Sequence, residues 1–224
     1  MSKNKLISFD LDSTLVDPTY TTFVWEIGIP QRYANKYGTN PSEAAAIVKA
    51  EYESLGDSSL EWYNIAYWFD YFKLPGSWQD LMEEHREKIR PFPEVIEVME
   101  YLVQYHDLIV ISNAAREFVE IEVEEAKISK YFINIFSTTS DFRQVKKTSH
   151  IYKQIFEIMG IEPTNAIHVG DHYEFDYLVP KTLGIESYFL DRDGTKPRNS
   201  STVNDLREFA NLIREPKASL NNSQ

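Results

Sequence analysis

The sequence predicts an α/β fold, in which a parallel β-sheet is covered by helices on both faces and interrupted by a helical insertion. Three observations support this prediction. Five short apolar runs alternate along the chain with helical patterns, as strands and helices do in parallel sheets. The interval between the first two runs is too long for a single crossover helix. That interval also contains residues that typically begin and end helices.

Each apolar run has the length of a buried strand and is followed by polar or turn residues. The five predicted strands are LISF (6–9), LIVIS (108–112), INIFS (133–137), AIHVG (166–170) and SYFL (187–190). Apolar residues recur at helical spacing between the later strands and after the last one. The helices predicted for the core cover 95–102, 117–130, 149–159 and 203–213.

The interval between the first two strands contains the signals of about four helices. Asn40, followed by Pro41 and Glu43, has the pattern of an N-cap, a first turn and a capping partner. Ser77 and Asp80 repeat this opening signal. All four tryptophans of the chain lie in the interval, at positions 25, 62, 68 and 78. We expect their rings to fill the core of a small helical bundle, with a role beside a ligand as the alternative.

These patterns divide the chain into three parts. Pro91 and Pro93 mark the end of the insertion, because proline interrupts a helix. We expect residues 1–16 and 91–215 to form the α/β core and residues 17–90 to form the helical insertion. The last residues, 216–224, are polar and are expected to form a flexible tail.

The composition excludes several kinds of protein. The chain has 224 residues, and its 35 acidic and 23 basic side chains give a formal net charge of −12. This negative field disfavours general binding to nucleic acid or to an anionic membrane, since both carry phosphate. The absence of cysteine from the sequence excludes disulfides, thiolate metal sites and a cysteine nucleophile. No apolar run approaches the length of a membrane span, so we expect a soluble cytoplasmic protein.

The segment DLDST (10–14) directly follows the first predicted strand. In an extended segment, Asp10 and Asp12 project to the same side, about 6 to 7 Å apart. Two carboxylates at this distance repel each other by roughly 2 to 3 kcal/mol at an effective dielectric constant of about 20. A divalent cation at one carboxylate, or a proton on the other, relieves this repulsion. A solvated turn is the alternative explanation, since Asp, Ser and Thr favour turns.

Polar residues also follow the second and fourth predicted strands. The Ser112 hydroxyl and the backbone N–H groups that begin at Asn113 could hold an anionic oxygen, although a plain helix cap is the alternative. Asp171 leaves the sheet after Gly170, at the same edge as the first acidic segment if the strands are parallel. Asp176 either caps the next helix or supports the site from behind.

A carboxylate-rich site for phosphate would also need a fixed positive side chain, which binds the charge on the transferred oxygens. Lys146 and Lys147 precede the predicted helix 149–159 and are the candidates. A solvated loop charge is the alternative for either lysine.

Together these segments resemble the four motifs of the haloacid dehalogenase-like (HAD) hydrolase superfamily, over residues 5–192. The resemblance lies in DLDST, in Ser112-Asn113, in a lysine before a helix and in Gly170-Asp171 with a later aspartate. The family's spacing between this lysine and the following helix favours Lys146 over Lys147. The resemblance implies a Rossmann-like sheet with strand order 5-4-1-2-3. It also implies that the insertion is a helical cap, with hinges near 15–19 and 90–93.

The resemblance also implies a role for each candidate residue. Asp10 would be the nucleophile that forms an aspartyl-phosphate, and Asp12 the general acid and base. The Asp10 carboxylate, the Asp12 backbone carbonyl and the Asp171 side chain would bind Mg²⁺. The remaining implied groups are Ser112, Asn113 and Lys146 around the phosphoryl oxygens, with Asp176 and Thr14 in supporting positions.

The function implied is a Mg²⁺-dependent hydrolase acting on a small phosphorylated metabolite, as a monomer or homodimer. Three alternatives are a 2-haloacid dehalogenase, a phosphotransferase or mutase on the same core, and a non-catalytic binding module. Asp12 favours a phosphatase, because the dehalogenase branch lacks an acid two residues after its nucleophile. The chain departs from the family where Lys-Thr-Ser follows Lys146, since Pro-Asp-Pro is frequent there, and this departure concerns the geometry of the loop.

Overall fold

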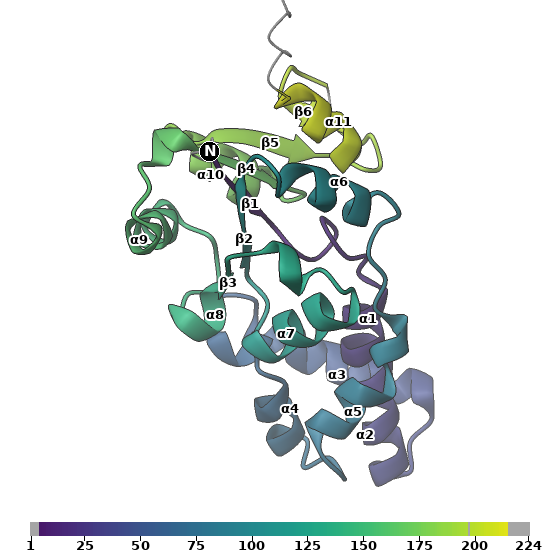
Figure 1. The fold of residues 1–224 in the computed structure, drawn as a ribbon. Helices are drawn as coiled ribbons and strands as arrows, with labels where there is room; N and C mark the ends of the chain where they lie inside the picture. The colour runs from purple at the N-terminus through teal and green to yellow at the C-terminus, as the bar shows by residue number, and fades with distance from the viewer. Residues whose placement is uncertain (1–4, 197, 215–224) are drawn as a thin grey trace, which may run out of the picture.

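The computed structural model describes residues 5–196 and 198–214, which form one six-stranded sheet with helices around it (Figure 1). The strands are β1 (Leu6–Phe9), β2 (Asp107–Ser112), β3 (Asn134–Ser137), β4 (Ala166–Gly170), β5 (Glu186–Leu190) and β6 (Thr202–Val203). All neighbouring strands are parallel, in the order β3-β2-β1-β4-β5-β6. The predicted α/β class is confirmed, and each of the five apolar runs forms a strand.

The strand order differs from the predicted one by a sixth strand. Taken from the other edge, the sheet contains the expected order 5-4-1-2-3 and adds β6 outside β5. Residue 203 is predicted to lie in a helix, whereas Thr202 and Val203 pair with Phe189 and Leu190. The last helix, α11, begins only at Leu206. A two-residue strand is too short to show a pattern of its own.

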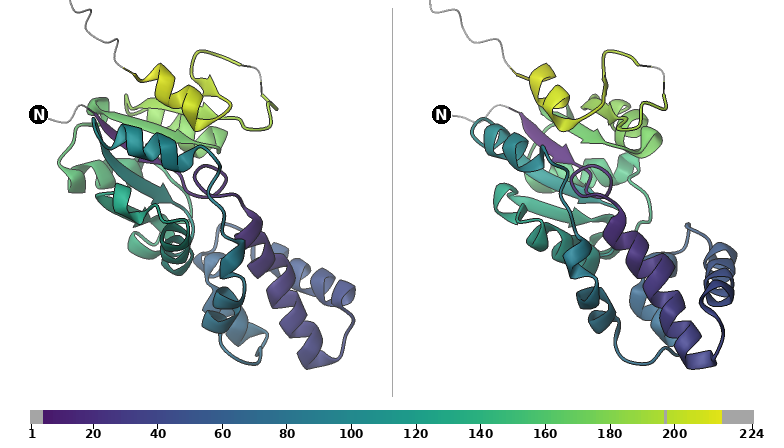
Figure 2. Two further views of the ribbon diagram at one scale, coloured as in Figure 1. Left: turned by 45° about the vertical axis from the view of Figure 1, so that its right-hand side comes forward. Right: turned by 90° about the vertical axis from the view of Figure 1, so that its right-hand side faces the viewer.

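Helices cover both faces of the sheet (Figures 1 and 2). Those of the core are α6 (Val95–Leu102), α7 (Arg116–Glu125), η4 (Ser129–Tyr131), α8 (Thr138–Asp141), α9 (Ser149–Met159), η5 (Pro163–Asn165), η6 (Tyr173–Leu178), α10 (Val179–Lys181) and α11 (Leu206–Leu212). Helices α6, α7 and α11 pack with Ile7 and Phe9 of β1 on one face. Helix α9 packs with Leu6 and Ile109 on the other. This alternation explains why the central strands are apolar on both sides.

The insertion between β1 and β2 is helical throughout, and lies beyond the ends of these strands (Figures 1 and 2). Its elements are α1 (Thr19–Thr22), η1 (Phe23–Gly28), α2 (Ile29–Tyr37), α3 (Pro41–Leu55), η2 (Leu60–Tyr63), α4 (Ile65–Tyr71), α5 (Trp78–Glu84) and η3 (Arg86–Lys88). The limits 17–90 for this unit stay a prediction, and the predicted tail, 216–224, lies outside the described residues. Among the described helices, none combines the length and the apolar character needed to cross a membrane.

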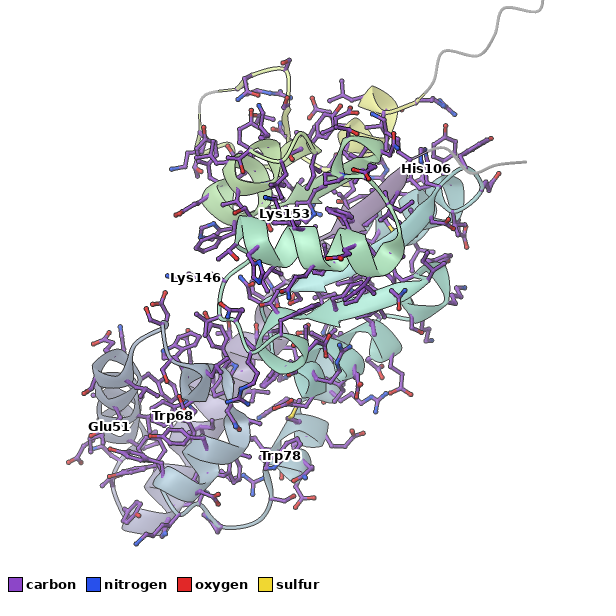
Figure 3. All side chains as sticks on the ribbon, turned by 90° about the vertical axis from the view of Figure 1, so that its left-hand side faces the viewer. Glu51, Trp68, Trp78, His106, Lys146 and Lys153 are labelled. Carbon is purple, nitrogen blue, oxygen red and sulfur yellow. The ribbon has the colours of Figure 1, made fainter. Side chains whose placement is uncertain are left out.

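The capping residues predicted for the insertion are present. Asn40 Oδ1 accepts a hydrogen bond from the Glu43 N–H at 2.9 Å, and Ser77 Oγ accepts one from the Asp80 N–H at 3.0 Å. Each bond satisfies a backbone donor that the helix itself leaves unpaired. Trp68 is buried within the insertion, as expected for a ring in the core of a helical bundle (Figure 3).

Two linkers join the insertion to the sheet and are hydrogen-bonded to each other. The Asp17 N–H donates to the Arg90 carbonyl at 2.9 Å, and the Phe92 N–H donates to the Leu15 carbonyl at 3.1 Å. The chain therefore enters and leaves the insertion at one place, beside the end of β1.

Candidate active site

Polar side chains gather where three neighbouring strands end. Asp10 follows β1, Ser112 ends β2 and Asp171 follows β4. Because the strands are parallel and adjacent, their carboxyl ends lie at the same edge of the sheet. The chain order of the strands reverses between β1 and β4, and ligands bind at such switch points in open α/β sheets.

A buried lysine links two carboxylates at this edge. Nζ of Lys147 lies 2.5 Å from Oδ1 of Asp10 and 2.6 Å from Oδ1 of Asp176, and Lys147 is 1% exposed. Burial lowers the pKa of Lys147, but the charges of Asp10 and Asp176 outweigh burial and leave the pKa above its ordinary value. Burial raises the pKa of Asp176, but Lys147 and His168 leave it below its ordinary value. One positive charge is thus fixed beside Asp10.

The structure corrects the prediction that Lys146 occupies this position. Nζ of Lys146 lies 3.7 Å from Oδ2 of Asp57 in the insertion, and its side chain is 37% exposed (Figure 3). The two lysines are adjacent in the chain, and only Lys147 is turned into the core, so an error of one residue exchanges a buried ammonium for a surface one. Thr148, which caps α9, follows Lys147 directly.

Two further carboxyl groups of the site have pKa values above those of solvent-exposed aspartates. Burial, followed by the charge of Asp10, raises the pKa of Asp12 to about 7. Burial, followed by the charges of Asp10 and Asp176, raises the pKa of Asp171 to about 8. Burial also raises the pKa of Asp10, against the effect of Lys147. The site therefore concentrates more negative charge than the lysine neutralises.

The carboxylates at this edge fit a hard divalent cation. One oxygen atom from each of Asp10, Asp171 and Asp176 lies within 4.8 Å of the others. Both oxygen atoms of Asp176 already accept hydrogen bonds, Oδ1 from Lys147 and Oδ2 from the His172 N–H, which leaves Asp10 and Asp171 as the better ligands. Oδ1 of Asp12 is buried without a hydrogen-bond partner among the described residues. Oxygen donors with unrelieved negative charge are the ligands that Mg²⁺ prefers.

Ser112, Asn113 and Thr14 surround these carboxylates. Ser112 Oγ accepts a hydrogen bond from the backbone N–H two residues later at 3.0 Å. Oδ1 of Asn113 accepts one from Oγ1 of Thr138 at 3.0 Å, which orients the Asn113 side chain. Thr14 Oγ1 donates to Oδ1 of Asp171 over 3.5 Å, a long hydrogen bond. Ser112 and Asn113 line the same cavity as Asp10 and Asp171, and Thr14 contacts Asp171 directly.

Asp176 is not a helix cap. It lies within η6, whereas the N-cap is His172, whose Nδ1 accepts a hydrogen bond from the Phe175 N–H at 3.2 Å. A Cβ atom on Gly170 would lie 2.5 Å from Cγ of Asp176. The close approach of Asp176 to β4 therefore requires glycine at position 170. Of the two roles expected for Asp176, the geometry supports the one in which it holds other residues of the site.

Two buried residues behind the site were missed in the sequence analysis. Nε2 of His168 lies 3.2 Å from Oδ1 of Asp176, and its Nδ1 lies 2.7 Å from Oγ of Ser8. The hydroxyl of Tyr152 lies 3.0 Å from the same Nε2. Burial lowers the pKa of His168 even beside Asp176. This network holds the Asp176 carboxylate against Lys147. A histidine inside the apolar run AIHVG was the one signal that could have indicated it.

A cavity of about 360 Å³ lies between this edge of the sheet and the insertion. Its polar and charged lining residues include Asp10, Asp12, Ser112, Asn113, Lys147 and Asp171, and its lining also includes Thr21, Trp25, Trp62, Tyr63 and Phe118. The rings of Trp25 and Phe118 stack, with centroids 5.3 Å apart and planes at 18°. The indole N–H groups of Trp25 and Trp62 donate to no other described residue. The lining of the cavity therefore combines ionic groups with aromatic rings.

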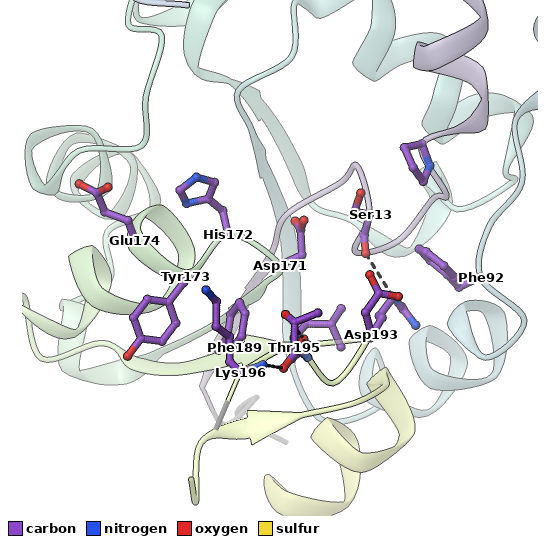
Figure 4. Close-up of a pocket in the computed structure, with 14 residues that line it drawn as sticks. Ser13, Phe92, Asp171, His172, Tyr173, Glu174, Phe189, Asp193, Thr195 and Lys196 are labelled. Carbon is purple, nitrogen blue, oxygen red and sulfur yellow. Dashed lines mark hydrogen bonds between the residues drawn. The ribbon is translucent and has the colours of Figure 1, made fainter. Parts of the chain in front are cut away.

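A second cavity, of about 680 Å³, lies on the other side of Asp171 (Figure 4). Ser13, Asp171 and His172 line both cavities. Figure 4 shows Ser13 and Phe92 on the same side of the second cavity. The loop after β1 thus forms part of the wall between the two spaces.

Glu122 of α7 is a buried carboxyl that no sequence pattern singles out. Neither of its oxygen atoms has a hydrogen-bond partner among the described residues, and the side chain is fully buried. Burial, followed by the charges of Asp12 and Asp10, raises the pKa of Glu122 well above its ordinary value. These surroundings therefore favour the protonated form of the Glu122 carboxyl.

Comparison with known proteins identifies one family whose model matches most of the chain. The family described as "Haloacid dehalogenase-like hydrolase" matches residues 7–190, a range that includes β1 to β5 and the helical insertion. Haloacid dehalogenase-like hydrolase domain-containing protein 3 of Danio rerio is 43% identical over 60 residues, or 26% of this chain and 25% of that protein. The chain thus spans about a quarter of that relative. GMP/IMP nucleotidase YrfG of Escherichia coli (strain K12) is 20% identical over 169 residues, or 74% of this chain and 73% of that protein.

Solved structures share the fold over nearly the whole chain. An HAD phosphatase from Thermococcus onnurineus has a TM-score of 0.80 and 22% identity, covering 93% of this chain and 97% of that one. A 2-haloacid dehalogenase from Pseudomonas syringae pv. Tomato DC3000 has a TM-score of 0.68 and 19% identity, covering 94% and 98%. At these identities, the likeness shows a common architecture.

Proposed function

The chain belongs to the haloacid dehalogenase-like hydrolase family, and on that basis we propose that it hydrolyses a small phosphomonoester with Mg²⁺ as cofactor. The observation that carries the proposal is the carboxyl of Asp12, which lines the same cavity as Asp10 and Lys147. An alcohol leaving group needs a proton, and burial raises the pKa of Asp12 to about 7. Asp12 can therefore donate a proton near neutral pH.

In the proposed reaction, the Asp10 carboxylate attacks phosphorus and forms an aspartyl-phosphate, while Asp12 protonates the departing alcohol. Asp12 then accepts a proton from the water that hydrolyses this intermediate. Inorganic phosphate is released, and both carboxyl groups return to their starting states. Mg²⁺, held by Asp10, Asp171 and the Asp12 backbone carbonyl, would supply positive charge to the phosphoryl oxygens.

We propose that Lys147, Ser112 and Asn113 hold the phosphoryl oxygens. Lys147 takes the role that the sequence analysis assigned to Lys146, because its ammonium lies beside Asp10. Asp176 binds the same ammonium and fixes its direction. The Asn113 side chain is oriented through its Oδ1 atom, so its amide N–H₂ group is available to an anion in the cavity.

Loss of halide is the alternative reaction, since several solved structures with this fold are dehalogenases. A carbon–halogen bond breaks without protonation of the leaving group, so that reaction needs no acid beside the nucleophile. The position of Asp12 in the cavity supports phosphate-ester cleavage instead.

We propose that the leaving group of the substrate is a nucleoside. Trp25, Trp62 and Tyr63 line the cavity that also contains Asp10, and aromatic side chains stack favourably on nucleobases. The two indole N–H groups can donate hydrogen bonds to acceptor atoms of a base. The relative named as a GMP/IMP nucleotidase adds support for this substrate class.

We also propose that residues 17–90 act as a cap over a core formed by residues 1–16 and 91–215. Thr21, Trp25 and Trp62 of the insertion contribute to the cavity that holds Asp10. A cap in this position would exclude water and select the leaving group.

Hydrolysis is tested with p-nitrophenyl phosphate in the presence of Mg²⁺. We expect turnover in the wild-type protein, and loss of turnover both in Asp10→Asn and after addition of a chelator. Asp70→Asn provides the matched control, because Asp70 is exposed on α4 in the insertion. Full activity of Asp10→Asn, or full activity after removal of divalent cations, would refute the proposal.

The substrate class is tested by comparing inosine 5′-monophosphate with ribose 5-phosphate, which has the same phosphoester but no base. We expect the wild-type kcat/KM to favour the nucleotide by about tenfold, as the stacking of one base on an aromatic ring provides. Trp62→Leu should lower this preference and leave turnover of ribose 5-phosphate unchanged. Trp78→Leu is the control, since Trp78 lies outside the cavity. Equal kcat/KM values for the two substrates in the wild type would exclude a nucleoside subsite.

A further inference from the structure

We propose that Arg192 is a positioning residue for the loop that carries Asp12, an inference that rests on the role proposed for Asp12. Arg192 lies just beyond the end of β5 and reaches the loop that follows β1. Its Nε atom donates to the Ser13 carbonyl at 3.1 Å, and its Nη2 atom donates to the Thr14 carbonyl at 2.7 Å. Because both contacts are to the main chain, Arg192 acts on Asp12 through the backbone of the loop.

The loop has a backbone that needs such support. Ser13 has a φ of +59°, in the left-handed region that residues other than glycine rarely adopt. The Leu11 carbonyl accepts the N–H groups of Thr14 at 3.2 Å and Leu15 at 2.8 Å, which closes a tight turn. The carbonyls of Ser13 and Thr14 point out of this turn to Arg192. The guanidinium thus satisfies two backbone acceptors of a strained segment.

The guanidinium is itself held on two further sides. Its Nη1 atom donates to Oε1 of Glu94 at 2.7 Å, and Glu94 is 4% exposed at the start of α6. Its Cζ atom lies 3.5 Å from the centroid of the Phe92 ring. Phe92 belongs to the second linker of the insertion and lines the same cavity as Ser13 (Figure 4). One planar group therefore joins the loop of Asp12, the linker and the sheet.

The position of Asp12 depends on this junction, because Asp12 is the residue that directly precedes Ser13. Without the guanidinium, the two carbonyls lose their donor and the Ser13 backbone can relax toward an ordinary conformation. A shift of about 1 Å in a catalytic group can lower the rate about 100-fold. The loop does not provide the groups proposed to bind phosphate oxygens, so Arg192 should affect turnover more than substrate binding.

Steady-state kinetics with p-nitrophenyl phosphate and Mg²⁺ tests this role. We expect Arg192→Ala to lower kcat by about tenfold or more, with KM changed by less than about threefold. Arg207→Ala is the matched control, because Arg207 on α11 forms an ion pair with Glu97 and does not contact the loop. It should leave both constants unchanged. Added guanidinium ions should restore part of the kcat of Arg192→Ala, and Arg192→Lys should have an intermediate kcat because an ammonium lacks the planar fork.

Amide hydrogen exchange measures the loop independently of activity. In Arg192→Ala we expect faster exchange at residues 14–16 and unchanged exchange in α9. Unchanged exchange in the loop, or a kcat within about twofold of the wild type in folded Arg192→Ala, would overturn the proposal. If Arg192→Ala does not fold, the proposal is tested with Arg192→Lys by the same two measurements, kcat and amide hydrogen exchange in the loop. A wild-type protein without phosphatase activity would refute the proposed function, and the exchange experiment would still test the positioning role.

Discussion

Nζ of Lys147 lies 2.5 Å from Oδ1 of Asp10, and both side chains are buried. Asp176, which is fully buried, binds the same ammonium at 2.6 Å. The single positive charge of Lys147 is therefore shared between two carboxylates, while Asp12 and Asp171 have raised pKa values nearby. This arrangement leaves an excess of negative charge, which a bound cation would offset and which would otherwise repel an anionic phosphoryl group.

Replacing Lys147 by alanine should abolish turnover and destabilise the protein. The variant would leave Asp10 and Asp176 buried without the ammonium, and breaking a buried ion pair in this way costs about 3–5 kcal/mol. Lys146→Ala is the matched control and should change the free energy of unfolding by less than about 0.5 kcal/mol. Urea unfolding and kcat measure both effects. Similar losses in the two variants would contradict the assignment of Lys147.

The activity should depend on the protonation of Asp12. Burial raises the pKa of Asp12 to about 7, so the protonated form that donates to the leaving group is present below that pH and disappears above it. We expect kcat/KM for an alkyl phosphate to fall as the pH rises through about 7. When the charge of Mg²⁺ lowers the pKa of Asp12, the same fall should occur at a lower pH. Asp12→Asn should remove this limb of the profile. An identical pH profile in the variant would exclude Asp12 as the acid.

Mg²⁺ should stabilise the protein more at pH 8 than at pH 5. The pKa of Asp171 is raised from 3.8 to about 8 by burial and by Asp10. The contribution of the Asp171 carboxyl to the free energy of unfolding is therefore complete below pH 3.8 and is lost as the pH rises through 8. A bound cation offsets this loss. At 100 times its Kd, Mg²⁺ should add about 2.7 kcal/mol, or about 5–10 °C in Tm.

Thermal denaturation of the wild type and Asp171→Asn measures this effect. The variant should show little increase in Tm with Mg²⁺ at either pH. Asp70→Asn, which alters an exposed carboxylate of the insertion, should respond like the wild type. An equal Mg²⁺-induced increase in Tm in Asp171→Asn would show that the cation binds elsewhere.

Glu122→Gln should make the protein more stable than the wild type at alkaline pH. Burial raises the pKa of Glu122 well above 4.5, so its contribution to stability is complete below pH 4.5 and is lost as the pH rises. For one such group, the loss approaches about 1.4 kcal/mol per pH unit. The difference in unfolding free energy between variant and wild type should therefore grow between pH 5 and pH 8. Exposed Glu120, changed to glutamine, is the control, and a constant difference for Glu122→Gln would contradict this explanation.

The sequence predicts the central fold well because buried parallel strands are continuous apolar runs. The run at 6–9 forms β1 with the same limits, and the helical pattern at 149–159 forms α9 with the same limits. Strand β6 could not be predicted, because Thr202 and Val203 become a strand only by pairing with β5. Its existence depends on a tertiary contact rather than on a local pattern.

Some residues of the site could likewise be predicted from local sequence patterns, and others could not. Asp10 and Asp171 could be placed at one edge of the sheet, because each follows an apolar run and parallel strands end together. The family's spacing favoured Lys146, whereas Lys147 is the lysine buried beside Asp10; both precede the same helix, and only packing buries one of them. Arg192 was not identified because its partners in the loop after β1 are distant in the sequence.

The most direct test of the account is mass spectrometry of the protein after rapid acid quenching during turnover of a phosphomonoester with Mg²⁺. We predict a phosphoryl group on the peptide that contains Asp10, present in the wild type and absent from Asp10→Asn. Continued release of phosphate with no phosphorylated Asp10, or with the phosphoryl group on another residue, would contradict the proposed mechanism.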